Sequence, residues 1–357
     1  MQKPSAFLQR QEQKIAHIRR MFPDPQRLTQ ETRRELYEAL KDIIGKTPLR
    51  STDAAYGSKI WITEESENPG ESHYDRCFYH LLEHMESDGS IIPNQTTLME
   101  VTSGSAGISF GWICKILGYQ SKIVIPDELP PARRRIIEET VDEVIPSGRP
   151  GEYLEGAVQT FKTLVKNKQT LAEIKNKKLA LPNHSQTPLT PRAFEDIGRE
   201  VIAALPAHLH LDTFVCAIGN GTTVTGITRG LREQYKNISV HGFQDAKRGN
   251  HVTLFGAGGR GKLPMPFVEP QHYDQVTDLE EADWLPTFEA YNRGKTREDT
   301  IGRTSAAALT LANRIIEQRQ QAMNILILFY DKADRYGEEI VTDERAVYAG
   351  DGHWISE

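Results

Sequence analysis

From about residue 59 onward, the chain alternates short runs of β-branched residues with longer amphipathic segments. The short apolar runs predict strands at 59–63, 98–101, 121–125, 141–145, 213–218, 239–243 and 324–329. The segments between them have helical periodicity and predict helices at 75–87, 106–117, 130–139, 152–176, 192–204, 223–235 and 305–320. Such alternation is typical of a mostly parallel sheet with crossover helices, so we expect an α/β protein.

The length of 357 residues is enough for two domains. We expect a helical arm at 1–43, in which Thr29 caps a helix. A first α/β domain should follow at 44–185, and a second at 186–357.

Charge and composition exclude several classes of protein. The net charge of −6 argues against a general nucleic-acid binder. No stretch approaches the roughly 18 apolar residues of a membrane span, and the N-terminus has no apolar signal core. Cys77, Cys114 and Cys216 are far apart, which is typical of buried thiols in a reducing compartment. We therefore expect a cytoplasmic protein that binds neither nucleic acid nor membrane.

Two predicted strands end in glycine-containing turns that open helices, at 100–107 and 217–226. Glycine lets the backbone approach a ligand closely, and the free N–H groups at a helix start favour an anion. A tight strand–helix connection would have the same sequence pattern. A dinucleotide site is less consistent, because Val224 replaces the third glycine of its fingerprint and Asp245 is an isolated candidate for the ribose acid.

Seven segments in chain order resemble the pyridoxal-phosphate (PLP) enzymes of the cysteine synthase and cystathionine β-synthase family. They are Ile44–Leu49 (I-G-x-T-P-L), Thr102–Gly107 (T-S-G-N-T-G), Arg133-Arg134 with Val144-Ile145 (the "ERR…AEVV" segment), Ile197–Glu200 (T-G-P-E), Gly219–Thr223 (G-T-G-G-T), Gly302–Ala306 (G-I-S-S-G) and Asp331–Tyr336 (D-S-G-E-R-Y). The resemblance implies the tryptophan synthase β-like fold, in which two open, mostly parallel α/β domains face a central cleft.

The resemblance also implies roles for individual residues. The cofactor-binding residues would be Gly219, Asn220, Gly221, Thr222 and Thr223 around the phosphate, with Ser105 and Ser305 at the cofactor ring. The substrate-binding residues would be Thr102, Ser103 and Gly104. No metal is implied.

The cofactor lysine of this family is missing. Residues 68–76 resemble its N-P-x-x-S-x-K-D-R motif, and Tyr74 stands at the lysine position. In the family, the lysine binds PLP as a Schiff base and then moves protons at the substrate Cα. A phenol cannot form an imine, and its reference pKa of about 10 keeps it mostly protonated at neutral pH. Ser72 and Tyr74 are therefore the candidate catalytic residues.

Two further positions depart from the family. Ser105 replaces the asparagine that meets the PLP 3′-oxygen, and Ala106 replaces the threonine that helps to hold the substrate carboxylate. Another lysine could replace the lost one, with Lys46, Lys59 and Lys247 as candidates. Whether PLP is held without a covalent bond, or is not held at all, is left open by the sequence.

Several functions remain open. The first is lyase or transferase chemistry, by β-elimination or β-replacement, on a small amino acid. The second is a catalytically silent regulatory or ligand-sensing partner that binds a small amino acid or anionic ligand. A remote third is a zinc hydrolase, because His80, Glu83 and His84 match the H-x-x-E-H motif. A homodimer is the expected assembly.

Overall fold

The computed structural model describes residues 4–247, 252–254, 256–258, 266–268, 270–337, 346–348 and 354–356. The chain divides into two compact units. The first consists of Met1–Gly45 and Asn68–Leu189, and the second of Lys46–Glu67 and Thr190–Glu357.

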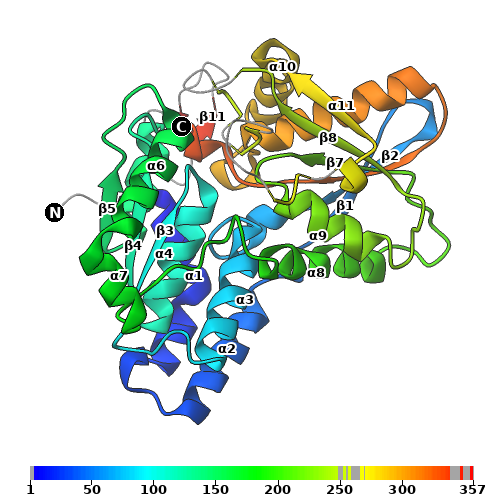
Figure 1. The fold of residues 1–357 in the computed structure, drawn as a ribbon. Helices are drawn as coiled ribbons and strands as arrows, with labels where there is room; N and C mark the ends of the chain where they lie inside the picture. Colours follow the sequence, from blue (N-terminus) through cyan, green and yellow to red (C-terminus); the bar gives the residue numbers. More distant parts are fainter. Residues whose placement is uncertain are drawn as a thin grey trace. The chain divides into compact units, whose positions relative to one another are not determined.

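The first unit contains a four-stranded parallel sheet in the order β5-β4-β3-β6. Its strands are β3 (Thr97–Val101), β4 (Gln120–Ile125), β5 (Glu143–Pro146) and β6 (Leu179–Ala180). Its helices are α1 (Ala6–Met21), α2 (Gln30–Ile43), α3 (Tyr74–Ser87), α4 (Ser105–Leu117), α5 (Pro131–Thr140), α6 (Tyr153–Lys166) and α7 (Lys168–Lys175), with the 3-10 turn η1 (Pro25–Arg27). Helix α6 lies against β3 and β4, and its Ala157 and Phe161 join a core cluster with strand residues such as Met99 and Val124 (Figure 1).

Two local predictions can be compared with the first unit. The side chain of Thr29 accepts a hydrogen bond from the backbone N–H of Thr32, which confirms it as the cap of α2. The prediction of one helix at 152–176 is wrong, because the chain forms α6 and α7 separately. Asn167 lies between them with extended backbone, and its side chain accepts the N–H of Gln169. A short polar side chain thus caps a new helix there.

The second unit contains a six-stranded sheet in the order β1-β2-β10-β7-β8-β9. Its strands are β1 (Leu49–Asp53), β2 (Lys59–Thr63), β7 (Thr213–Ala217), β8 (Ser239–Asp245), β9 (Gln275–Leu279) and β10 (Asn324–Leu328). Its helices are α8 (Leu189–Ala204), which begins at the last residue of the first unit, α9 (Thr222–Leu231), α10 (Glu281–Asn292) and α11 (Arg303–Arg319). Figure 1 shows α8 and α9 on one face of this sheet and α10 and α11 on the other.

All pairs in this sheet are parallel except β1 with β2. The remaining elements of the second unit are the 3-10 turns η2 (Ala55–Gly57), η3 (Glu65–Glu67), η5 (Pro270–His272), η6 (Arg297–Asp299) and η7 (Ala333–Arg335) and the antiparallel pair β11 (Ala346–Tyr348) and β12 (Trp354–Ser356).

The division into units differs from the expected domain boundaries: the first unit includes residues 1–45, expected as a separate arm up to 43, and it extends to residue 189. The largest difference is at residues 46–67. Residues 46–67 belong to the second unit, although the sequence placed 44–185 in the first domain. The physical reason is strand pairing, because β2 pairs along its whole length with β10, from Lys59 opposite Asn324 to Thr63 opposite Leu328. Hydrogen bonding to a distant strand outweighs proximity along the chain.

No helix within the described ranges is long and apolar enough to cross a bilayer.

Candidate functional site

The turn between β7 and α9 contains the predicted phosphate-binding residues, and we call residues 219–223 the glycine turn. Gly221 has a positive φ of 85°. A Cβ atom added there would lie 2.4 Å from the backbone carbon and oxygen of Phe267. This residue therefore has to be glycine for two reasons, its backbone conformation and the close approach of another segment.

The donors of the glycine turn converge on one oxygen. The backbone N–H of Thr222 donates to Oδ1 of Asn220 at 3.0 Å, and its hydroxyl donates to the same atom at 2.6 Å. The Thr222 side chain is fully buried, and Thr223 is nearly so. A helix start whose N–H and hydroxyl groups already gather around an oxygen acceptor has the chemistry of an anion site.

Ser305 lies in the first turn of α11 and is fully buried. Its Oγ accepts the backbone N–H of Tyr330 at 2.9 Å. A hydroxyl that accepts in this way keeps its own proton for donation to another acceptor. That agrees with the predicted contact to a ring nitrogen, which stays a prediction.

The predicted substrate residues follow β3 in the first unit. Thr102, Ser103 and Gly104 are all buried, and the N–H of Gly104 donates to Oγ1 of Thr102 at 3.3 Å. A Cβ atom at Gly104 would lie 3.0 Å from Nη1 of Arg133, which is 2% exposed. The structure thus places a buried cation beside this turn. Sequence analysis noted Arg133 only as part of a motif and predicted no role for it.

Tyr74, at the lysine position, is the first residue of α3 and is half-buried. Its backbone N–H donates to Oγ of Ser72 at 3.3 Å, and Ser72 is fully buried. The Tyr74 ring lies 4.3 Å from the ring of His73 and 5.6 Å from that of His184, measured between centroids. Position 74 is therefore flanked by two imidazoles.

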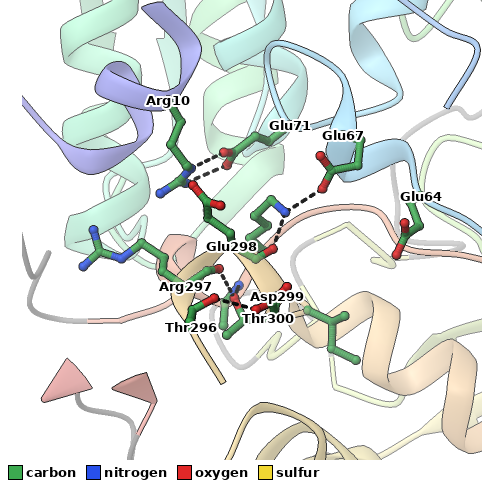
Figure 2. Close-up of polar contacts among 12 residues, drawn as sticks. Arg10, Glu64, Glu67, Glu71, Thr296, Arg297, Glu298, Asp299 and Thr300 are labelled. Carbon is green, nitrogen blue, oxygen red and sulfur yellow. Dashed lines mark hydrogen bonds and ion pairs between the residues drawn. The ribbon is translucent and has the colours of Figure 1, made fainter. Parts of the chain in front are cut away.

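Two contacts within the first unit hold residues 68–76. Asp75 accepts the N–H of Gly70 at 2.5 Å and the indole N–H of Trp112 at 2.8 Å. Arg10 of α1 reaches the same segment and makes a two-pronged contact with Glu71, at 2.6 and 3.0 Å (Figure 2). The backbone around position 74 is thus fixed by neighbours other than Tyr74 itself.

A buried carboxylate lies next to this segment. Glu100 of β3 is fully buried, and it accepts the N–H of Val101 at 2.9 Å and the backbone N–H of His184 at 3.0 Å. Its Oε2 lies 3.2 Å from Nδ1 of His184, an ion-pair distance without regular hydrogen-bond geometry. His184 is 5% exposed, and its ring also packs on Phe78. No motif in the sequence indicated His184.

The three candidate replacement lysines are exposed. Lys59 pairs with Asp53 at 2.6 Å, and Lys247 lies 3.9 Å from Glu281.

A different lysine is buried in the second unit. Lys332 is 4% exposed, and its Nζ lies 2.8 Å from Oε1 of Glu67 and 2.6 Å from the carbonyl of Glu298. Among the described lysines it alone is buried. No sequence pattern indicated it, because its partners lie far away along the chain.

The thiols are as expected. Cys77, Cys114 and Cys216 are free and buried. Burial raises the pKa of Cys216 to about 12, against a smaller opposing effect of Tyr330, so this thiol stays protonated at neutral pH.

The candidate residues of the alternative dinucleotide site and of the alternative zinc site have other partners. Asp245 accepts the backbone N–H groups of Thr253 and Leu254 at 2.5 and 2.7 Å. Glu83 accepts the hydroxyl of Tyr79 at 3.1 Å, and His84 lies 3.8 Å from Asp88. In the part of the chain that the structure describes, no three His, Cys, Asp or Glu side chains form a group that could hold a metal ion.

Comparison with known proteins identifies the family. The family model described as "Pyridoxal-phosphate dependent enzyme" matches residues 40–320. Cysteine synthase of Staphylococcus aureus (strain Mu50) is 28% identical over 206 residues, which cover 56% of this chain and 62% of that protein. Cysteine synthase B of Escherichia coli (strain K12) is 26% identical over 310 residues, covering 83% and 93%.

A solved structure agrees. The O-acetylserine dependent cystathionine β-synthase of Helicobacter pylori matches with a TM-score of 0.68 at 22% identity, over 85% of this chain and 98% of that one. At this identity the likeness shows the fold alone. The match to the S. aureus protein spans less than two thirds of that protein's length. The chain therefore belongs to the pyridoxal-phosphate dependent enzyme family, whose cofactor is pyridoxal phosphate.

Proposed function

We propose that this chain binds pyridoxal phosphate without a lysine bond and performs lyase or transferase chemistry, by β-elimination or β-replacement, on a small amino acid. The observation that carries the proposal is the buried Glu100–His184 pair beside Tyr74. This pair is an acid–base system next to the position from which the family's lysine is missing.

The residues of the second unit fit the cofactor. The N–H and hydroxyl of Thr222 converge on an oxygen acceptor, as a phosphate requires, and Ser305 keeps a proton for a ring nitrogen. Pyridoxal phosphate, when bound, supplies an electron sink for negative charge at the amino-acid Cα. Position 74 does not fit covalent attachment, because the phenol of Tyr74 cannot form an imine. The proposal is therefore non-covalent binding.

His184 has the surroundings of a proton-transfer group. The carboxylate of Glu100 lies beside Nδ1 of His184, so Nε2 is the nitrogen that would take the proton from the substrate. The rings of Tyr74 and Phe78 pack on the imidazole and exclude water, which strengthens the attraction between the Glu100 carboxylate and a charged imidazole. Tyr74 would add a phenolic proton donor.

The test is exchange of the Cα hydrogen of L-serine in D2O with added PLP, followed by proton NMR. The parent should exchange the Cα hydrogen faster than PLP alone. His184→Phe should lower the enzymatic exchange rate by about 10²–10⁴-fold, the usual contribution of a general base. His184→Phe should still bind PLP in equilibrium dialysis. The matched control is His84→Gln, which changes a histidine of the same unit whose side chain is 54% exposed. A parent no faster than free PLP would defeat the catalytic proposal.

A second function is favoured by a different observation. Tyr74, Ser105 and Ala106 all depart from the family, while the glycine turn is kept. A catalytically silent regulatory or ligand-sensing protein would have this pattern. It would gain thermal stability from PLP or another anionic ligand and show no exchange. In both cases we propose a small amino acid or anion as the ligand and a homodimer as the assembly, which light scattering tests.

A further inference from the structure

A hollow in the second unit lies at the C-terminal end of α9, away from the glycine turn at its start. Its volume is about 450 Å³, within the range of small-molecule sites. The side chains of Arg229, Arg232 and Lys236 line it, together with one carboxylate, Glu233. No function described above uses it.

The described residues that line the hollow carry an excess of positive charge. Glu233, the one carboxylate among them, is held by Arg199, with Oε1 at 2.7 Å from Nη2 and 2.9 Å from Nε. Arg199, and Lys236 to a smaller extent, lower the pKa of Glu233, so it stays ionised. Arg229 lies 4.0 Å from Glu195, a carboxylate that it shares with Arg199.

Two buried polar atoms belong to residues that line the same hollow. They are Oγ1 of Thr228, a residue that is 1% exposed, and Nε of Arg232. Within the described ranges neither has a hydrogen-bond partner. The guanidinium of Arg232 is held in place, since its Nη1 donates to the carbonyl of Gln271 at 3.1 Å. Both atoms are covered by protein, so the donors open to a ligand belong to the other cationic groups of the residues that line the hollow.

We propose that this hollow is a second anion site, for a small molecule that carries a phosphate or several carboxylates. A guanidinium whose position is fixed pairs with such oxyanions through two N–H groups. The C-terminal end of a helix is its negative end, so the binding depends on the side-chain cations and not on the helix dipole. The hollow therefore differs from the glycine turn, where the backbone N–H groups and the helix dipole both favour an anion. The inference goes beyond the proposed function and does not rest on it.

The experiment is calorimetric titration of the full chain with pyrophosphate, and separately with citrate, at low salt. The parent should show two classes of pyrophosphate site. Arg232→Gln should weaken the site in the hollow by about tenfold or more, as expected for lost charge-assisted hydrogen bonds. The matched control is Arg319→Gln, which removes an exposed charge of the same unit outside the hollow and should change nothing. Binding of citrate as well would extend the ligand class to polycarboxylates.

The double variant Thr222→Val/Thr223→Val separates the two sites. This variant should weaken pyrophosphate binding at the glycine turn and leave pyrophosphate binding in the hollow unchanged. The inference is overturned if pyrophosphate occupies a single site that this variant removes, or if Arg232→Gln and Arg319→Gln weaken binding equally. Should Arg232→Gln fail to fold by circular dichroism, Arg229→Gln takes its place, since the Arg229 side chain is 46% exposed and contributes little to folding.

Discussion

The glycine turn and the segment 68–76 compare differently with the family motifs that they resemble. The glycine turn has a backbone that requires glycine at Gly221 and donors at Thr222. Segment 68–76 has backbone supports, including Asp75, but the resemblance assigns Tyr74 to the position of the reactive amine. A shared fold does not prove a shared reaction, so the two segments have to be tested separately.

The largest effect is expected from Tyr74→Lys. This variant tests whether the residue at position 74 alone prevents segment 68–76 from forming an imine with PLP. Because its backbone is held by Asp75 and Glu71, the new amine should occupy the family's position. With added PLP the variant should gain a visible absorbance band that borohydride abolishes. The parent and Tyr74→Phe should show none.

A parent that already carries a borohydride-reducible adduct would contradict this prediction. Peptide mapping would then identify the lysine. Lys332 is to be checked first because it is buried, and then the exposed Lys46, Lys59 and Lys247.

The next effect concerns stability near position 74. Glu100→Leu should lower the free energy of unfolding by about 3–5 kcal/mol, because two backbone N–H groups and an imidazole lose a buried charged partner. His184→Phe should cost less, about 1–2 kcal/mol, since a phenyl ring can keep the ring contacts and Glu100 keeps its backbone donors. Urea denaturation of both variants measures the difference. Equal costs would mean that the imidazole is mainly a structural counter-charge and would weaken its proposed role in proton transfer.

The sequence alone predicted the strands whose residues form a clear apolar run. Buried strands such as β7 and β10 are continuous apolar runs and were predicted nearly to the residue. The edge strands β1 and β9 were missed, because Leu-Arg-Ser-Thr-Asp and Gln-Val-Thr-Asp-Leu are largely polar. An edge strand needs only one partner and tolerates polar side chains, so its signal is weak.

The candidate site could be predicted only where residue spacing is fixed. Such spacing predicts the glycine turn and Tyr74 at the lysine position, and both stay predictions. It could not give His184, whose meaning depends on Glu100 of a neighbouring strand, or Lys332, whose partner Glu67 is 265 positions away. Both are brought to their partners by the fold, and no short motif contains such a contact.

A smaller effect is expected in the glycine turn. Thr222→Val/Thr223→Val should weaken PLP binding by about 1–3 kcal/mol, because valine has a similar volume and no hydroxyl donor. Fluorescence or dialysis titration with PLP measures it. Thr310→Val, a buried threonine of α11 outside the hollow, is the matched control and should leave PLP binding unchanged. If the double variant binds PLP like the parent, the turn is a structural connection and the comparison with segment 68–76 fails.

The smallest effect is expected from Ser105→Asn, which restores the family's residue at the start of α4. Ser105 is half-buried, and the residue before it, Gly104, is extended rather than left-handed, so the larger amide should be accommodated without backbone strain. If position 105 contacts the cofactor oxygen, as the resemblance implies, the added amide should strengthen PLP binding by about 0.5–1.5 kcal/mol, the net value of one hydrogen bond.

The companion Ala106→Thr should not help PLP, because the resemblance relates that position to the substrate carboxylate. Its side chain would also enter a buried position, where added volume is costly. Tighter binding in Ser105→Asn alone would support the predicted contact between position 105 and the cofactor. No change would place Ser105 outside the cofactor site and favour the ligand-sensing function.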